Sequence, residues 1–134
     1  MHTARVKIIT DERCLAYSAA GHPERPARIS KTLEKLRNQT ELPLTWAEPL
    51  PVEAESIARA HSKEHIVRVK AATHDFDGDT PTYPEIYEHA CRSVGGGLHA
   101  LKAARAGELA FSLLRPPGHH ATQDRAMGFC YLSS

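Results

Sequence analysis

The stretch Leu109-Ala110-Phe111-Ser112-Leu113-Leu114-Arg115-Pro116-Pro117-Gly118-His119-His120-Ala121 decides how this chain folds. Its first six residues form a mostly apolar run of strand length, which a pair of prolines and a glycine ends. In open α/β sheets, ligands bind at the carboxyl ends of the strands. The stretch therefore predicts a strand over residues 109–113 that presents two adjacent histidines at its carboxyl end.

Working outward, two more segments suit short strands: residues 5–9, with β-branched side chains, and residues 44–47, bounded by prolines. Apolar residues at helical spacing separate the three strands. This alternation predicts an α/β fold with a short parallel sheet. One expected helix begins at Pro26, and two short ones cover 52–60 and 62–73. The last expected helix carries an apolar stripe from Ile86 to Leu101 and stops at Gly107. Residues 11–26 are expected to form a long loop.

The glycine triplet Gly95-Gly96-Gly97 lies inside the last expected helix. A phosphate-binding glycine loop precedes a helix rather than interrupting one. We therefore expect these glycines to allow close packing of the helix on the sheet, and we do not infer nucleotide binding.

The composition argues against several classes of protein. The 134 residues carry 17 Lys+Arg against 16 Asp+Glu, which argues against a general surface for nucleic acid or for an anionic membrane. No apolar run is long enough to span a bilayer, and the first residues do not resemble a signal peptide. Three cysteines are too few and odd in number for a disulfide framework, so we expect a reducing, cytoplasmic location. The length suits one domain over residues 1–134.

The tandem histidines are the candidate catalytic groups. Histidine titrates near neutral pH, so of two neighbouring imidazoles one can move a proton while the other holds charge or a hydrogen bond. A solvated, functionless turn is the alternative interpretation of such a pair. The rigid Pro116-Pro117-Gly118 ahead of the pair and Met127-Gly128-Phe129-Cys130 behind it favour the functional interpretation.

Residues 115–134 resemble the active-site signature of the histone deacetylase superfamily, which includes acetylpolyamine amidohydrolases. Three further segments resemble elements of that family in the same order along the chain: Gly21–Ile29, Ala60–Ile66, and Asp79–Pro81 with the later Ser93–Gly97. The resemblance covers nearly the whole chain. It implies a partial arginase/deacetylase-like three-layer fold and a zinc-dependent hydrolase of acetyl-lysine-like or acetylpolyamine substrates.

The resemblance also implies roles for individual residues. His120 matches the general base, and His119 matches the histidine that stabilises charge in the transition state. The remaining matches are to substrate-binding or inner-cavity positions: Asp79 at the rim, Gly128 and Phe129 in the wall of the acyl-lysine tunnel, and Arg28 and Cys130 at the inner cavity. From the residues alone, Asp79 also fits a solvated acidic turn, Arg28 an exposed helix charge and Phe129 a core side chain. Cys91 is expected to be core. Six further histidines are expected to be structural or at the surface: His22, His61, His65, His74, His89 and His99.

The family's zinc ligands, an Asp-x-His pair and a second Asp, and its catalytic tyrosine all match positions beyond Ser134. A catalytic zinc needs about three protein ligands and an open position. We therefore expect zinc for the complete family domain and no zinc bound through ligands in this chain, so that residues 1–134 form an incomplete, N-terminal portion that is inactive alone. Ser133 also departs from the family, which has Asn there.

Two classes of function remain open at this stage. The chain is either part of a zinc amidohydrolase or a non-catalytic, self-associating remnant that acts as an interaction module. A protein that binds metal directly through His119 and His120 is a third, weaker alternative. In the family, a later strand pairs with the strand at 109–113. We therefore expect homo-oligomers through region 109–132, where Leu113, Phe129 and Leu132 would otherwise be exposed.

Overall fold

A short parallel sheet forms one half of the molecule. In this computed structural model, which describes residues 4–134, β1 (Val6–Ile9) lies between β2 (Leu44–Ala47) and β3 (Leu109–Ser112). Both pairings are parallel, and Ile8 is in register with Trp46 on one side and Phe111 on the other. The predicted strands and the predicted parallel sheet are confirmed.

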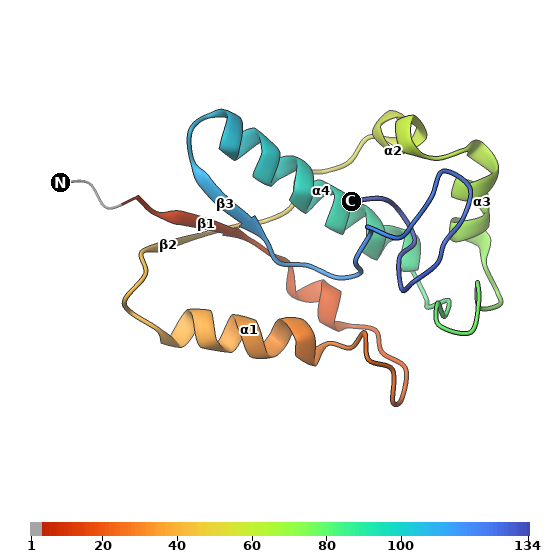
Figure 1. Ribbon diagram of the computed structural model, residues 1–134, viewed down its shortest axis with the longest axis horizontal. Helices are drawn as coiled ribbons and strands as arrows, with labels where there is room; N and C mark the ends of the chain where they lie inside the picture. Colours follow the sequence, from red (N-terminus) through yellow and green to blue (C-terminus); the bar gives the residue numbers. More distant parts are fainter. Residues whose placement is uncertain (1–3) are drawn as a thin grey trace.

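Helices cover both faces of the sheet, giving three layers (Figure 1). On one face, α1 (Ala27–Asn38) buries Ile29 and Leu33 in a cluster with Ile8 and Leu113. On the other face, α4 (Ile86–Arg105) packs along β3 and β1. The arrangement matches the α/β fold that the sequence predicted.

The glycines of α4 explain its close approach to its neighbours. A Cβ atom on Gly96 would overlap the side chains of Ser112 and Leu114, and one on Gly95 would overlap the carbonyl oxygen of Leu50. A Cβ on Gly97 would meet nothing within 4 Å. Close packing therefore accounts for two members of the triplet.

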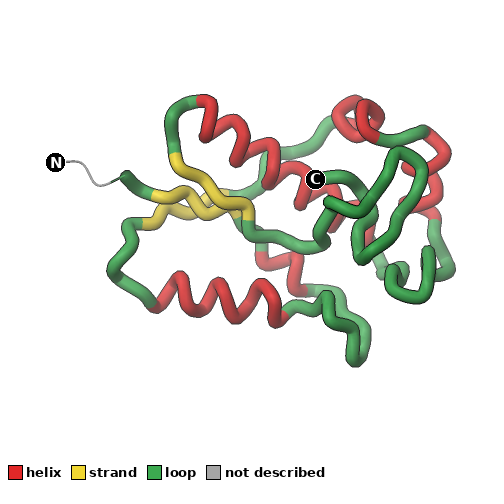
Figure 2. The backbone as a smooth tube through the Cα atoms, in the orientation of Figure 1, coloured by secondary structure: helices red, strands yellow, loops and turns green. Residues whose placement is uncertain are grey.

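The other half of the molecule holds α2 (Ala54–Ala60), α3 (Lys63–Ala71) and long loops, which gather on one side in Figure 2. Ser62 caps α3, because its hydroxyl accepts from the backbone N–H of His65. A second apolar cluster joins these elements to α4 and to the C-terminal loop: Tyr17, Ile57, Val69, Ile86, Ala90, Ala126, Tyr131 and Leu132.

Two details differ from the sequence-based expectations. The expected loop 11–26 contains a short 3₁₀ helix, Glu12–Leu15, because Asp11 caps it by accepting from the Arg13 N–H. The expectation that Leu113 and Leu132 are exposed is wrong. Leu113 packs under α1 and Leu132 packs in the second cluster, so they are only 8% and 1% exposed. The exposed apolar residues of β3 are instead Leu109 and Phe111.

Candidate functional site

A cavity of about 390 Å³ opens at the carboxyl end of β3, where loops from four parts of the chain meet. Six of the seven residues expected at the site line this cavity: Arg28, Asp79, His119, His120, Gly128 and Phe129. Pro23, Glu24 and Pro117 complete the lining. The seventh residue, Cys130, lies beneath His120. Lining residues up to 106 positions apart in the sequence, Pro23 and Phe129, are thus brought to one place.

The tandem histidines project from a rigid turn. The Arg115–Pro116 bond is cis, and Gly118 packs so closely on the backbone of Leu132 and Ser134 that no Cβ would fit there. The rings of His119 and His120 lie 4.2 Å apart between centroids, and both residues are exposed to solvent. The pair can therefore exchange protons with water and with a molecule in the cavity.

Gly128 and Phe129 form the wall opposite the histidines in a left-handed backbone conformation, with φ of 58° and 70°. Such a conformation is costly for phenylalanine and is found mostly at functional sites. The Phe129 N–H donates to the hydroxyl of buried Thr80 at 3.3 Å, which helps hold this turn. A Cβ on Gly128 would come within 2.8 Å of the His120 ring, so only glycine leaves room for that histidine.

Cys130 supports His120 from below. Its sulfur is fully buried, accepts from the backbone N–H of His120 at 3.4 Å, and faces the Gly128 carbonyl at 3.3 Å. Burial raises the pKa of the Cys130 thiol, so the thiol stays protonated near neutral pH. These contacts favour packing over nucleophilic attack.

His22 belongs to the rim of the site, although the sequence analysis treated it as structural or at the surface. Its Nδ1 accepts from the Glu24 N–H, so the proton sits on Nε2, which donates to the Asp79 carbonyl at 2.8 Å. Its ring meets Phe129 edge-on, with centroids 4.8 Å apart. His22 thus ties the Asp79 turn to the aromatic wall. Only its place inside the Gly21–Ile29 segment could have signalled this role.

Arg28 lies on the cavity wall, with 44% of its side chain exposed, and pairs with Glu24 at 2.7 Å. Behind it lies Arg115, a completely buried side chain to which the sequence analysis gave no role. Its guanidinium binds the Glu24 carboxylate and the carbonyls of Cys14 and Tyr17, and it lies over the Tyr17 ring. Glu24 is therefore shared by one buried and one accessible arginine.

The residues present do not fit a catalytic zinc ion. Within residues 4–134, no group of three or more His, Cys, Asp or Glu side chains is arranged to hold a metal ion. Glu24, one of the two carboxylates at the cavity, is already held by two arginines. A catalytic zinc needs about three ligands and an open position, so no step of a reaction is assigned to a metal on these residues.

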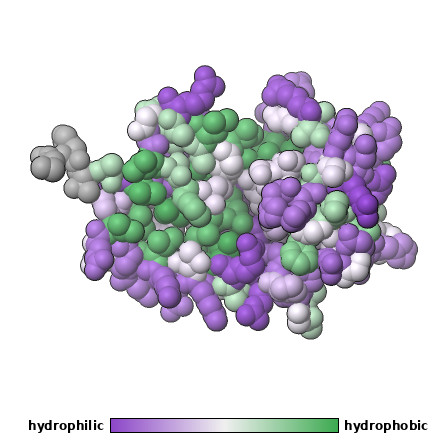
Figure 3. Space-filling view, in the orientation of Figure 1, coloured by the Kyte–Doolittle hydropathy of each residue, from purple (hydrophilic) through white to green (hydrophobic). Residues whose placement is uncertain are grey.

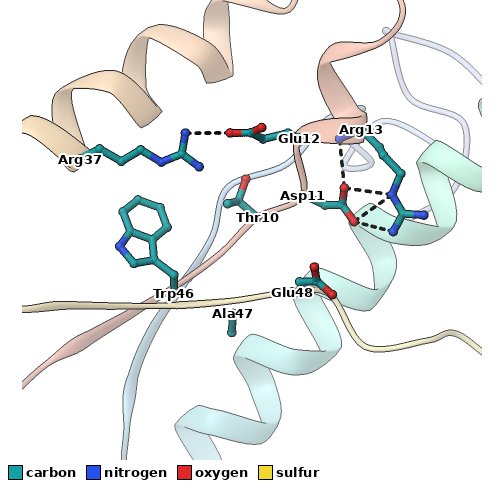
Figure 4. Close-up of a pocket in the computed structure, with 8 residues that line it drawn as sticks. All are labelled: Thr10, Asp11, Glu12, Arg13, Arg37, Trp46, Ala47 and Glu48. Atoms are coloured by element: carbon teal, nitrogen blue, oxygen red, sulfur yellow. Dashed lines mark hydrogen bonds and ion pairs between the residues drawn. The ribbon is translucent and has the colours of Figure 1, made fainter.

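A second hollow, of about 610 Å³, lies at the carboxyl ends of β1 and β2 (Figure 4). Two ion pairs occupy it, Arg13 with Asp11 at 2.6 Å and Arg37 with Glu12 at 2.8 Å. Its charged groups thus largely satisfy one another, and it lacks the paired imidazoles of the first cavity. We take the cavity at His119 and His120 as the candidate functional site.

Comparison with known proteins identifies the family of this chain. The model of the histone deacetylase domain matches residues 22–134, which include every residue that lines the cavity. The chain belongs to the histone deacetylase family. A histone deacetylase-like amidohydrolase of Pseudomonas aeruginosa is 38% identical over 126 residues, covering 87% of this chain and 33% of that protein.

Two further relatives of the histone deacetylase family show the same partial coverage. An acetylpolyamine amidohydrolase of Burkholderia pseudomallei is 44% identical over 69 residues, covering 51% of this chain and 20% of that protein. The crystal structure of the HDA15 HD domain superposes with a TM-score of 0.79 at 27% identity, covering 98% of this chain and 41% of that one. The chain thus spans about a third of the length of the first of these curated relatives. In the described part of the chain, no helix is long and apolar enough to cross a membrane.

Proposed function

We propose that residues 1–134 are the N-terminal portion of a zinc-dependent amidohydrolase domain, and that they supply its proton-handling and substrate-contacting groups. The observation that supports this proposal is the single cavity that gathers His119, His120 and Phe129 with Arg28 and Asp79. The substrate would be a linear amide of acetic or another short acid with a lysine-like amine or a polyamine.

Each group has a chemical task in the hydrolysis of such an amide. His120 takes the proton of the attacking water as the water oxygen bonds to the amide carbon, and the proton then passes to the leaving amine. His119, whose ring is 4.2 Å away, donates a hydrogen bond and stabilises negative charge on the reacting oxygen. The C–N bond breaks, and the products are a carboxylate and an amine.

The remaining groups would hold the substrate. The flat face of Phe129 suits an aliphatic amine chain. The Asp79 carboxylate at the exposed rim can accept from backbone N–H groups of a peptide substrate, and Arg28 offers a cation for the carboxylate product. The zinc ion of the complete domain would be bound by residues outside this chain. A cytoplasmic location fits the three unpaired cysteines.

Ligand binding tests the substrate part of this proposal without turnover. A peptide containing N-acetyl-lysine is titrated into the 134-residue chain while the NMR signals of His119, His120 and Phe129 are followed. We expect saturable shifts of these signals that the Phe129→Ala variant abolishes. The Phe111→Ala variant is the control, because Phe111 lies on β3 outside the cavity. Shifts that are absent, or that persist equally in Phe129→Ala, would contradict the proposal.

A second candidate function is self-association without catalysis. One edge of β3 has no partner strand among the described residues, and Leu109 and Phe111 are 55% and 56% exposed there. Apolar side chains also collect over this region on the face seen in Figure 3. An open apolar edge strand tends to pair with another chain, so we propose a homo-oligomer formed through β3.

A further inference from the structure

Two buried histidines outside the cavity hold the loop that carries Phe129 and Cys130. His61, which follows α2, is 3% exposed, and His65 on α3 is fully buried. Their rings stack with centroids 4.6 Å apart. Both face the C-terminal loop, residues 121–134, rather than the tandem pair.

The hydrogen bonds of His61 require one particular neutral form. Its Nε2 accepts from the backbone N–H of Ser133 at 2.8 Å, so that nitrogen carries no proton. The proton is therefore on Nδ1, which faces the carbonyl of Gln123 at 3.3 Å. With a second proton on the ring, the Nε2–H of His61 and the N–H of Ser133 would be two donors facing each other, and this hydrogen bond would be lost.

His65 uses the opposite tautomer. Its Nε2 lies 2.8 Å from the carbonyl oxygen of Tyr131, which can only accept, so Nε2 carries the proton. Its Nδ1 is buried and has no hydrogen-bond partner among the described residues. Burial also lowers the pKa of His65, which keeps the ring neutral.

Beside their apolar contacts with Ala126, Tyr131 and Leu132, these helices add further hydrogen bonds at the start of the loop. The N–H of Ser62 donates to the Gln123 carbonyl at 3.0 Å, and the Arg68 guanidinium donates to the Asp124 carbonyl at 2.9 Å. Near the end of the loop, the two histidines make the hydrogen bonds. His65 on α3 donates to the Tyr131 carbonyl, and His61 at the end of α2 accepts from the Ser133 N–H. The residues between these anchor points include Gly128, Phe129 and Cys130.

We propose that His61 and His65 are positioning residues of the candidate site. As neutral rings of opposite tautomer, they hold the loop by hydrogen bonds and so keep Phe129 and Cys130 against His120. The importance of this positioning for catalysis rests on the proposed function. The positioning itself can be tested without measuring turnover.

Thiol labelling separates local release of the loop from global unfolding, because the chain contains an internal control. Cys130 and Cys14 are both fully buried, but Cys14 lies in the other cluster, under α1. Each is quantified by peptide mass spectrometry after timed reaction with a thiol reagent. The variant His65→Leu removes the donor to Tyr131, and His65→Gln retains an amide N–H at about the position of Nε2.

We expect His65→Leu to increase the labelling rate of Cys130 by roughly ten- to a hundredfold, with Cys14 unchanged, and His65→Gln to restore most of the protection. The variant His99→Leu is the control, since the ring of His99 also bonds a carbonyl, that of Glu48, which lies outside the loop. Equal acceleration of Cys14 and Cys130, or continued protection of Cys130 in His65→Leu, would overturn the proposal.

A spectroscopic measurement covers the case in which His65→Leu does not fold. In the unmodified chain, ¹⁵N shifts and couplings of the histidine rings distinguish Nδ1–H from Nε2–H. We expect Nδ1–H for His61 and Nε2–H for His65 at neutral pH. The same tautomer for both, or a charged ring at either position, would overturn the proposal. The proposed function can fail independently, since neither experiment measures binding or hydrolysis.

Discussion

Glu24 holds the guanidinium of Arg115 through two parallel hydrogen bonds, both 2.9 Å long, although the residues are 91 positions apart. Both side chains are buried, and Glu24 also pairs with Arg28 on the cavity wall. This contact joins the loop that precedes α1 to the turn that carries the tandem histidines. It is the electrostatic link behind the candidate site.

Removing Arg115 should therefore be costly. The substitution Arg115→Met leaves the Glu24 carboxylate buried without its main partner, which we expect to lower the free energy of unfolding by about 3–5 kcal/mol. Urea denaturation measures the change. The matched control Arg28→Met removes the more exposed partner of Glu24 and should cost only about 0–1 kcal/mol. Similar losses of unfolding free energy in both variants would show that the buried Glu24–Arg115 pair stabilises the fold no more than the exposed Glu24–Arg28 pair.

Alanine substitutions of Gly128 and Gly97 should change the stability of the chain in opposite directions. In Gly128→Ala, the new Cβ would lie 2.8 Å from the His120 ring on a backbone of positive φ, so the histidine must move. We expect a changed NMR environment for His120 and lower stability. In Gly97→Ala, the Cβ meets nothing within 4 Å inside α4, and helix propensity should add about 0.5–1 kcal/mol of stability. An unmoved His120 signal in Gly128→Ala would contradict the described wall.

His89 should make stability depend on pH. It is 5% exposed, and burial, reinforced by the nearby Arg92, lowers the pKa of His89 from 6.5 to about 4. Between these values the unfolded chain binds the extra proton, so stability is full above about pH 6.5 and falls as the pH drops toward 4. The loss attributable to this group is about 3 kcal/mol.

The variant His89→Gln isolates that contribution. Denaturation at pH 7 and at pH 4 should show a smaller difference in this variant than in the unmodified chain, by roughly the same 3 kcal/mol. His74→Gln, on an exposed loop, should leave the difference unchanged. A pH dependence identical in all three proteins would mean that His89 does not titrate as described.

The chain alone should not hydrolyse amides. Residues 4–134 hold no group of ligands suited to zinc, so we expect a zinc-supplemented sample to leave an acetyl-lysine reporter intact. In a version that contains the whole domain, His120→Ala should lower kcat by about 100- to 10,000-fold, the usual effect of losing a general base. Cleavage by the 134-residue chain that disappears in His120→Ala would refute the first expectation.

Self-association should depend on β3. We expect light scattering to detect a dimer or larger species, and Phe111→Lys to shift it to monomer by placing a charge on the open edge. Leu101→Lys, an equally exposed position on α4, should have a smaller effect. A monodisperse monomer of the unmodified chain at high concentration would exclude this function.

The regular elements were predictable because their signals are local. The apolar spacing of Ile29 and Leu33 lies within one helix, and the strand at 109–113 lies between Gly107 and a pair of prolines. The tandem histidines were found for the same reason. The resemblance to a known family then directed attention to Arg28 and Asp79, which share no local pattern with them.

What the sequence did not reveal depends on partners far away in the chain. His22 bonds to Asp79, 57 positions on, and His61 to Ser133, 72 positions on. No spacing rule encodes such pairs, so these histidines were expected only to be structural or at the surface. Leu132 was expected to be exposed because the family elements that would cover it match positions beyond Ser134. It is instead buried by residues of the second cluster, which come from four other parts of the chain.

The order of the strands also constrains how the molecule can form during synthesis. β1 is made before β2 and β3 but lies between them in the sheet, and the hydroxyl of Thr10 just after it donates to the Leu113 carbonyl, 103 residues later. Pairings between such distant segments form slowly, because closing a long loop costs conformational entropy before any stabilising contact is made. As the chain leaves the ribosome, β1 can pair only with β2 until β3 emerges. The turn with both catalytic candidates therefore reaches its place only after β3 has been made and has paired with β1.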